Sequence, residues 1–143
     1  MKLYLMRHAE AEISGQEMKQ DAERRLTEGG RLQARVAAGK LKEKLAGSNE
    51  EIGQIITSPY VRAVETADIV ATALGLDGKV AQEKDLAPGA GIDKIKRIED
   101  EYRDSGSLLL VGHEPDLGII ASQLLRLNAA RPLAKAEVVE IRV

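Results

Sequence analysis

Short apolar segments alternate with segments of helical periodicity along most of this 143-residue sequence. The apolar segments are predicted strands, and they cover residues 2–6, 52–58, 80–82, 107–112 and 137–143. The intervening segments place apolar residues three or four positions apart, which predicts amphipathic helices. Strands that alternate with helices favour a mostly parallel sheet with helices on both faces. We therefore expect an α/β fold, a three-layer α/β/α sandwich, in a single domain over residues 1–143.

Local signals set the bounds of the first helix. Thr27 is expected to be its N-cap, because a hydroxyl there can accept a hydrogen bond from the first helical turn. The helix should end before Gly47. Four apolar side chains are expected on or near its buried face: Leu32, Val36, Leu41 and Leu45. The polar residues 9–25 before this helix are expected to form a loop.

The other helices show similar signals. Ser58 and Pro59 are expected to be the cap and the first residue of the second helix, which should stop at Gly75. Apolar spacing over residues 92–102 predicts a third helix. Residues 115–125 predict a fourth helix, opened by a proline.

Composition limits the classes of function. The core must be mainly Leu, Ile, Val and Ala, because the sequence has no Phe and no Trp. A net charge of −2 argues against a nucleic-acid-binding module, which needs a basic face. The absence of cysteine excludes disulfides and thiolate chemistry. No apolar stretch approaches the roughly 20 residues that cross a bilayer, and the chain begins without a signal-peptide pattern. We expect a cytoplasmic protein with no membrane or nucleic-acid partner.

Polar clusters follow three of the predicted strands. Arg7 and His8 come directly after the first strand, and Arg62 comes soon after the second. His113 follows residues 107–112, so both histidines of the chain lie at strand carboxyl ends, where sheets of this kind bind ligands. If these strands are neighbours, two imidazoles and two guanidiniums meet in one crevice beside helix N-termini. Such a site suits a dense anion, and phosphate is the expected ligand.

Such a site can also do chemistry. The sequence shows no cysteine, no P-loop and no Gly-rich dinucleotide turn, which leaves a histidine as the expected nucleophile. An imidazole nitrogen can attack phosphorus and form a covalent phosphohistidine. Flanking arginines can neutralise the oxygens of the transferring group. We expect this chemistry to need neither a metal nor a cofactor.

Four motifs resemble those of the histidine phosphatase superfamily. MRHAEAE resembles its RHG signature, and RRLTEGGRLQA resembles its RPLTxxG segment. SPYVRAVETA is similar to SPxxRAxQTA, and LLLVGHEPDL is similar to the LLLVGHNP-type second-histidine motif. The motifs keep their order and span almost the whole chain. The short length and the LTxxG segment resemble the SixA-type phosphohistidine phosphatases, which implies a phosphoglycerate-mutase-like fold.

The resemblance implies a role for each matching residue. His8 would be the nucleophile that becomes phosphorylated. Arg7, Arg62 and His113 would bind the phosphoryl group and stabilise its transition state. Arg24 matches the arginine of RPLT, and the resemblance makes it a further candidate for contacting the phosphate from the loop.

Three positions depart from the family pattern. Arg25 replaces the proline of RPLT, so Arg24 and Arg25 could exchange roles. Ala9 stands where the signature often has Gly. Glu114 stands where one branch has an Asp general acid. Glu114 is either a candidate general acid or a carboxylate that a helix N-terminus favours.

The resemblance implies hydrolysis of protein phosphohistidine through a phospho-His8 intermediate. The partner would be a histidine-phosphorylated protein, such as a phosphotransfer domain or carrier, and the pocket would hold phosphate or a similar oxyanion. A protonated imidazole leaves easily, so this substrate tolerates a weak general acid. Two alternatives stay open: a phosphatase of a small phosphorylated metabolite with Glu114 as its acid, and a non-catalytic phosphate-binding module.

Overall fold

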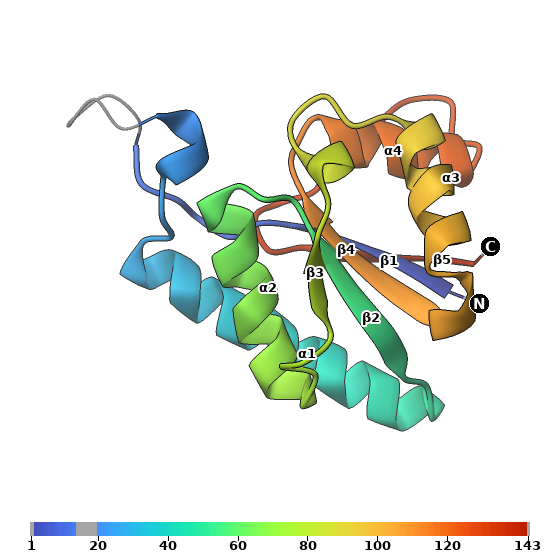
Figure 1. Ribbon diagram of the computed structural model, residues 1–143, viewed down its shortest axis with the longest axis horizontal. Helices are drawn as coiled ribbons and strands as arrows, with labels where there is room; N and C mark the ends of the chain where they lie inside the picture. The colour runs from blue at the N-terminus through green and yellow to red at the C-terminus, as the bar shows by residue number, and fades with distance from the viewer. Residues whose placement is uncertain (1, 14–19, 143) are drawn as a thin grey trace.

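Five strands form the central sheet of the computed structural model, which describes residues 2–13 and 20–142 (Figure 1). The strands are β1 (Lys2–Arg7), β2 (Ile52–Thr57), β3 (Val80–Gln82), β4 (Ser107–Gly112) and β5 (Val138–Arg142). Their order is β3-β2-β4-β1-β5, and of these strands only β5 is antiparallel to its neighbour. The expected mostly parallel sheet is confirmed, with strand ends within one residue of prediction. Val143, the expected end of the last strand, lies outside the described residues.

Four α-helices pack around this sheet. They are α1 (Glu28–Ser48), α2 (Val61–Leu74), α3 (Ile92–Glu101) and α4 (Asp116–Leu124). Short 3-10 helices lie at Asp21–Glu23 (η1), Lys84–Leu86 (η2) and Arg103–Ser105 (η3). Among the described residues, no helix combines the length and the apolar character that crossing a membrane requires.

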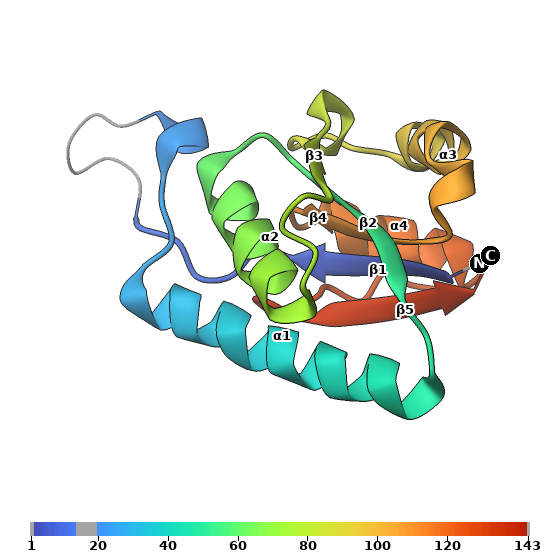
Figure 2. The same ribbon diagram turned by 60° about the horizontal axis from the view of Figure 1, so that its bottom comes forward.

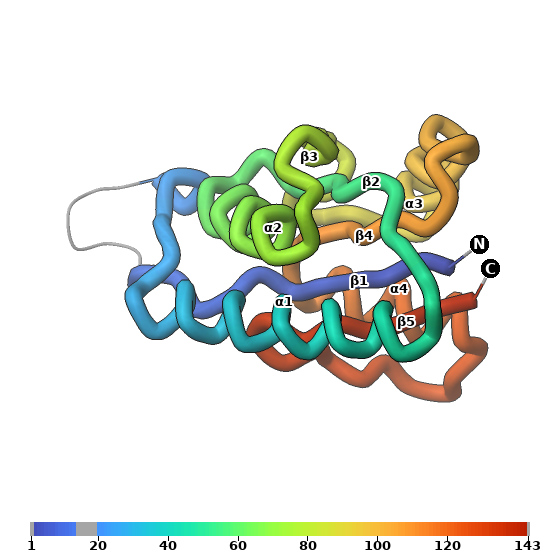
Figure 3. The backbone as a smooth tube through the Cα atoms, turned by 90° about the horizontal axis from the view of Figure 1, so that it is seen from below, coloured from blue at the N-terminus to red at the C-terminus, as the bar shows by residue number. Residues whose placement is uncertain are grey.

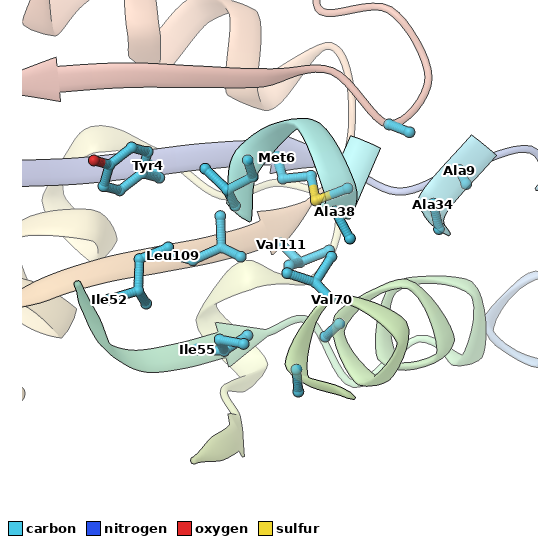
Figure 4. Close-up of a cluster of buried hydrophobic side chains, with 14 of the residues drawn as sticks. Tyr4, Met6, Ala9, Ala34, Ala38, Ile52, Ile55, Val70, Leu109 and Val111 are labelled. Carbon is cyan, nitrogen blue, oxygen red and sulfur yellow. The ribbon is translucent and has the colours of Figure 1, made fainter. Parts of the chain in front are cut away.

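The strands divide their side chains between two aliphatic cores, because alternate residues of a strand point to opposite faces of the sheet. Tyr4 and Met6 pack with Leu109 on the face that α1 and α2 cover (Figures 2 and 4). Leu3 and Leu5 belong to the second core, on the face that α3 and α4 cover. The expected three-layer sandwich is confirmed.

The face of helix α1 that packs against the core is not the one that the spacing of its large apolar residues predicts. Thr27 caps it as expected, and its hydroxyl accepts a hydrogen bond from the Gly30 amide at 2.9 Å. Leu32 and Val36 are 57% and 50% exposed, so the prediction that they face the core is wrong. A Cβ on Gly30 would lie 2.0 Å from the Glu10 carbonyl oxygen, so only a glycine at this position lets α1 approach the Glu10 backbone so closely. The buried positions are Gly30, Ala34, Ala38, Leu41 and Leu45.

The segments on either side of α1 also differ from expectation. The expected loop over residues 9–25 contains η1 and a β-bridge from Ala11. Residues 14–19 of that loop lie outside the described residues. At its other end α1 continues past Gly47, and it is closed by Asn49 in a left-handed conformation with φ of 54°.

Helix α2 begins at Val61, two residues later than expected. Ser58 is not its cap, because the Ser58 amide continues the sheet by donating to the Val111 carbonyl at 3.0 Å. The Ser58 hydroxyl then accepts from the Tyr60 amide at 3.1 Å, which makes Ser58 and Pro59 a turn between strand and helix. The turn frees the Ser58 side chain for the site described next.

Candidate active site

Three strand ends meet at one edge of the sheet. Because β4 lies between β1 and β2, the residues that follow these strands are neighbours. The His8 amide donates to the Gly112 carbonyl at 3.1 Å, in register with the paired ends of β1 and β4. The ring centroids of His8 and His113 lie 5.2 Å apart, and the rings are inclined at 60°. The fold therefore brings the only two histidines of the sequence together.

An open cavity of about 370 Å³ lies at this edge. It is lined by Arg7, His8, Ala11, Asp21, Arg24, Arg62, Pro88, His113, Glu114 and Lys135. Four of these side chains are cationic and two are carboxylates, so the charge of the cavity favours an anion. All six candidate site residues from the sequence lie in this lining. Across residues 2–13 and 20–142, no three His, Cys, Asp or Glu side chains are grouped to hold a metal ion.

His8 keeps one ring nitrogen unprotonated and facing Arg62. Its Nδ1 lies 2.7 Å from the carbonyl oxygen of Ala9. A carbonyl can only accept, so Nδ1 carries the proton and Nε2 keeps its lone pair. Nε2 accepts a hydrogen bond from Nε of Arg62 at 3.2 Å. The Ala9 amide donates to the Thr66 hydroxyl at 3.1 Å, which anchors the backbone that sets this tautomer.

Both histidines are neutral at neutral pH. Burial lowers the pKa of His8 from 6.5 to about 4; the hydrogen bond to Ala9 opposes this shift, and Arg62 adds to it. Burial also lowers the pKa of His113 to about 3, and the neighbouring His8 and Arg62 add to the shift. A neutral His8 can attack an electrophile without first losing a proton to a base.

Arg62 is 5% exposed and lies in the first turn of α2, where a cation opposes the helix dipole. Asp21 offsets this cost: its carbonyl accepts from the guanidinium at 2.8 Å and its carboxylate accepts at 3.2 Å. The guanidinium also lies 5.0 Å from the ring centroid of Tyr60. These contacts hold Arg62 beside His8, where it can stabilise developing negative charge.

Two buried nitrogens of the cavity have no hydrogen-bond partner in the described part of the chain: Nε of Arg7 and Nδ1 of His113. A second nitrogen of Arg7 donates to the Leu133 carbonyl at 3.0 Å, and Nε2 of His113 lies 2.8 Å from the Ser58 hydroxyl. That hydroxyl can donate to Nε2, which leaves Nδ1 of His113 with the proton. Unpaired buried donors are costly, and oxygens of a bound anion would satisfy them.

Arg24 and Arg25 take separate places. Arg24 lines the cavity, where its Nε donates to the Asp21 carboxylate at 2.9 Å and a second nitrogen donates to the Glu12 carbonyl at 2.8 Å. The Arg25 side chain lies outside the cavity, 3.6 Å from a carboxylate oxygen of Glu65. Arg24 rather than Arg25 is therefore placed to reach a bound anion.

Glu114 also lines the cavity, although neither of its buried carboxylate oxygens has a hydrogen-bond partner among the described residues. Its Oε2 packs against α4, because a Cβ on Gly118 would lie only 2.9 Å from it. The first turn of a helix favours a negative charge there. This placement fits a helix-start carboxylate, and the cavity position keeps Glu114 a candidate acid.

Sequence reasoning missed two residues of this site. Asp21 holds both Arg62 and Arg24, but it lies in a polar segment without a periodic pattern that could mark it. Ser58 was expected to cap a helix and was counted in the polar cluster after the second strand, but it was given no role in the site; its hydroxyl contacts His113. Its position at a strand end, beside the other polar clusters, was the signal for such a role.

Comparisons with known proteins agree with this geometry. The family model of the histidine phosphatase superfamily (branch 1) matches residues 3–87. The phosphohistidine phosphatase SixA of Escherichia coli is 27% identical over 126 residues, which cover 87% of this chain and 74% of that protein. The solved structure of the protein histidine phosphatase SixA complexed with tungstate has a TM-score of 0.81 at 22% identity, over 100% of this chain and 88% of the other. Phosphoglycerate mutase from Bacillus anthracis has a TM-score of 0.75 at 17% identity, over 97% and 86%, and confirms the expected fold type.

Proposed function

This chain belongs to the histidine phosphatase superfamily, in its small SixA-type branch, and is a phosphatase; from that premise we propose that it removes phosphoryl groups from protein phosphohistidine. One observation carries the proposal: the Nε2 lone pair of His8 lies beside the Arg62 guanidinium, in a cavity with unpaired buried nitrogens. A phosphoryl group needs such a nucleophile and such cationic donors. The name of the Escherichia coli relative supports the substrate class.

In the first step, Nε2 of His8 attacks phosphorus and forms an N–P bond. The bond from phosphorus to the substrate imidazole breaks, and its electron pair stays on the departing nitrogen. The other nitrogen of that imidazole carries a proton, so the leaving group departs as a neutral ring. Arg7, Arg62 and His113 donate hydrogen bonds to the oxygens of the transferring group.

In the second step, water attacks the phosphorus of phospho-His8. The electron pair of the N–P bond returns to Nε2, and the proton of the water passes to a phosphate oxygen. Inorganic phosphate leaves. Throughout both steps the Ala9 carbonyl accepts from Nδ1–H of His8, and it stabilises the positive charge of the phosphorylated ring.

The chemistry of the leaving group supports the proposed substrate class. A protonated imidazole departs without a general acid, whereas an ester oxygen must be protonated as it leaves. The second candidate function is hydrolysis of a small phosphorylated metabolite, and the position of Glu114 in the cavity lining favours it. The non-catalytic phosphate-binding module is set aside, because the chain is a phosphatase and such a module has no use for a neutral histidine nucleophile.

The first experiment measures phosphate release from a histidine-phosphorylated carrier domain, beside p-nitrophenyl phosphate and a panel of phosphorylated metabolites. The His8→Ala variant is the blank. A clear preference for the phosphoprotein is the expected result. Preference for a phosphate ester would reject protein phosphohistidine as the substrate class. The histidine mechanism would stand, and the function would be hydrolysis of a small phosphorylated metabolite.

A variant at Glu114 separates the two enzymatic functions. Glu114→Gln should leave phosphohistidine cleavage intact, and it should abolish ester hydrolysis if Glu114 is the acid. Asp116→Asn, in the first turn of the same helix, is the matched control. Trapping of labelled phospho-His8 after a rapid acid-free quench would exclude the binding module.

A further inference from the structure

A second hollow, larger than the catalytic cavity, lies along α1. It has a volume of about 600 Å³, and its lining comes from α1 and from the segment that leads into β5. Figure 3 shows the course of the backbone of both elements. We call it the α1–β5 groove. Its apolar lining includes Tyr4, Leu32, Val36, Ala37, Ala136 and Val138.

The groove exposes apolar surface on an otherwise polar helix. Leu32 and Val36 lie one turn apart on α1, and both are at least half exposed. They are exposed because Gly30 and the alanines of α1 take the positions against the sheet. Large apolar side chains gathered in one hollow mark an interaction surface, whereas scattered ones do not.

The groove is lined by more lysines than carboxylates, so its net charge is positive. Lys40 makes no ion pair among the described residues, and the nearest carboxylate oxygen to Lys135 is that of Glu10, at 4.0 Å. A third lysine of the lining is already paired. The one acidic side chain of the lining, Glu137, is engaged by Arg131 at 2.8 Å. Carboxylates of a partner would therefore find one lysine without an ion pair in the described part of the chain, Lys40, and one held only by a long ion pair, Lys135.

The groove borders the catalytic cavity. Lys135 lines both hollows. The residue after Lys135 is hydrogen-bonded to the segment that carries His8. The Ala136 amide donates to the carbonyls of Arg7 and His8 at 3.1 and 3.3 Å. The Arg7 amide in turn donates to the Glu137 carbonyl at 3.1 Å. A molecule seated in the groove would therefore lie beside the segment that carries His8.

We propose that the α1–β5 groove docks the substrate protein by receiving an amphipathic helix whose apolar stripe is flanked by carboxylates. This inference rests on the proposed function, and it adds how the phosphoprotein is recognised. The apolar stripe packs against Leu32 and Val36. The flanking carboxylates pair with Lys40 and Lys135, and the phosphohistidine at one end of the docked element enters the cavity.

The dimensions and the charge both fit this occupant. Helix α1 lines the groove from Gly29 to Lys44, a length of about 22 Å, which accommodates roughly four turns of a partner helix. A second copy of this chain packed symmetrically would bring its own lysine rim against this one. Lysines of the two copies would then face one another, whereas the charge of the groove favours acidic groups on the partner.

The test uses two substrates with the same P–N bond: a histidine-phosphorylated protein that the wild type hydrolyses, and phosphoramidate, which is too small to dock. We expect the double variant Leu32→Asp, Val36→Asp to raise the KM for the phosphoprotein about tenfold or more, with kcat changed less than about twofold. Its kcat/KM for phosphoramidate should not change. Ile119→Asp, at an exposed apolar position on α4, is the matched control. Lys40→Glu should raise the same KM about threefold, and Lys42→Glu should not.

The outcomes separate the docking site from the proposed function. An unchanged KM for the phosphoprotein in the double variant overturns the docking site and leaves the function standing. Equal losses on both substrates also overturn it, because they indicate damage to the cavity. Loss of a wild-type dimer, with the phosphoprotein KM unchanged, assigns the groove to a second copy instead. A wild type that cleaves no phosphoprotein faster than phosphoramidate refutes the function, and the docking site with it.

Discussion

The catalytic cavity and the α1–β5 groove share Lys135 but are built in opposite ways. The cavity is the smaller, and most of its lining is charged or polar side chains that hold one another: Asp21 holds Arg62, which contacts His8. The groove is the larger, and apolar side chains such as Val36 are half exposed in it. Volume alone would therefore select the wrong hollow for the chemistry.

The difference shows which structural feature suits catalysis and which suits recognition of a partner. The ends of parallel strands gather charged and polar residues from distant parts of the sequence into one place, which suits catalysis. A helix whose small residues face the core leaves its large apolar residues outside, which suits recognition. Changes in the cavity should therefore affect every substrate, and changes in the groove should affect only substrates large enough to dock.

The largest expected effect is on the nucleophile. His8→Asn should lower kcat/KM for the phosphoprotein and for phosphoramidate alike, by roughly 10⁴-fold or more, because no covalent intermediate can form. Single-turnover phosphate release measures both. A loss confined to the phosphoprotein would break the comparison, because His8 would then act in recognition rather than in chemistry.

The close approach of α1 to the Glu10 backbone gives the next largest effect. Gly30→Ala should lower the free energy of unfolding by about 3 kcal/mol, because the new Cβ would lie 2.0 Å from the Glu10 carbonyl oxygen. Gly39→Ala on the same helix meets no atom within 4 Å, and it should raise that free energy by about 0.5–1 kcal/mol. Urea denaturation of both variants checks this. Equal stabilities would show that α1 is not seated on the Glu10 backbone.

The cavity should also respond to acid through its two buried histidines. NMR of the two imidazoles should give midpoints near pH 4 for His8 and near pH 3 for His113, instead of 6.5. Between pH 6.5 and 4 the unfolded chain binds more protons at these rings than the folded chain, so stability falls as the pH is lowered through this window. His113→Asn should make that fall less steep. Midpoints near 6.5 would contradict the burial of the rings.

A smaller effect is expected at the positioning residue Ser58. Ser58→Ala removes the hydroxyl that contacts Nε2 of His113, so kcat should fall about tenfold on both substrates. The ¹⁵N shifts of His113 should show a changed tautomer, which a merely structural role for Ser58 would not produce. Unchanged shifts together with the lower kcat would reject the positioning role.

The smallest effect is expected at Asp21, and in the opposite direction. Its carboxylate occupies Arg62 and Arg24, and thus competes with an incoming anion. Asp21→Asn should strengthen inhibition by inorganic phosphate about threefold to tenfold. Glu23→Gln makes the same change of net charge from the same short helix, and it is the control. Weaker inhibition in Asp21→Asn would show that Asp21 instead holds the arginines in their binding geometry.

Local patterns in the sequence predicted much of this molecule. The strands, the Thr27 cap and the histidines at strand ends all follow from signals within a few residues. The predictions failed where the answer depended on a distant contact. Ser58 caps no helix because Val111 and His113 engage it, and Leu32 is exposed because Gly30 must pass the Glu10 backbone. Asp21 had no local signal, since its partner Arg62 lies 41 positions away.

The sequence by itself determined the order of the elements and the residue types that chemistry requires, because periodicity, caps and strand ends are properties of short stretches of chain. The tertiary structure alone decided which of those residues meet. Insertion of β4 between β1 and β2 brings His113 beside His8, and the rotation of α1 turns Leu32 and Val36 into the groove. Pairing and packing join residues far apart in the chain, and their energies depend on the whole set of neighbours rather than on any one segment.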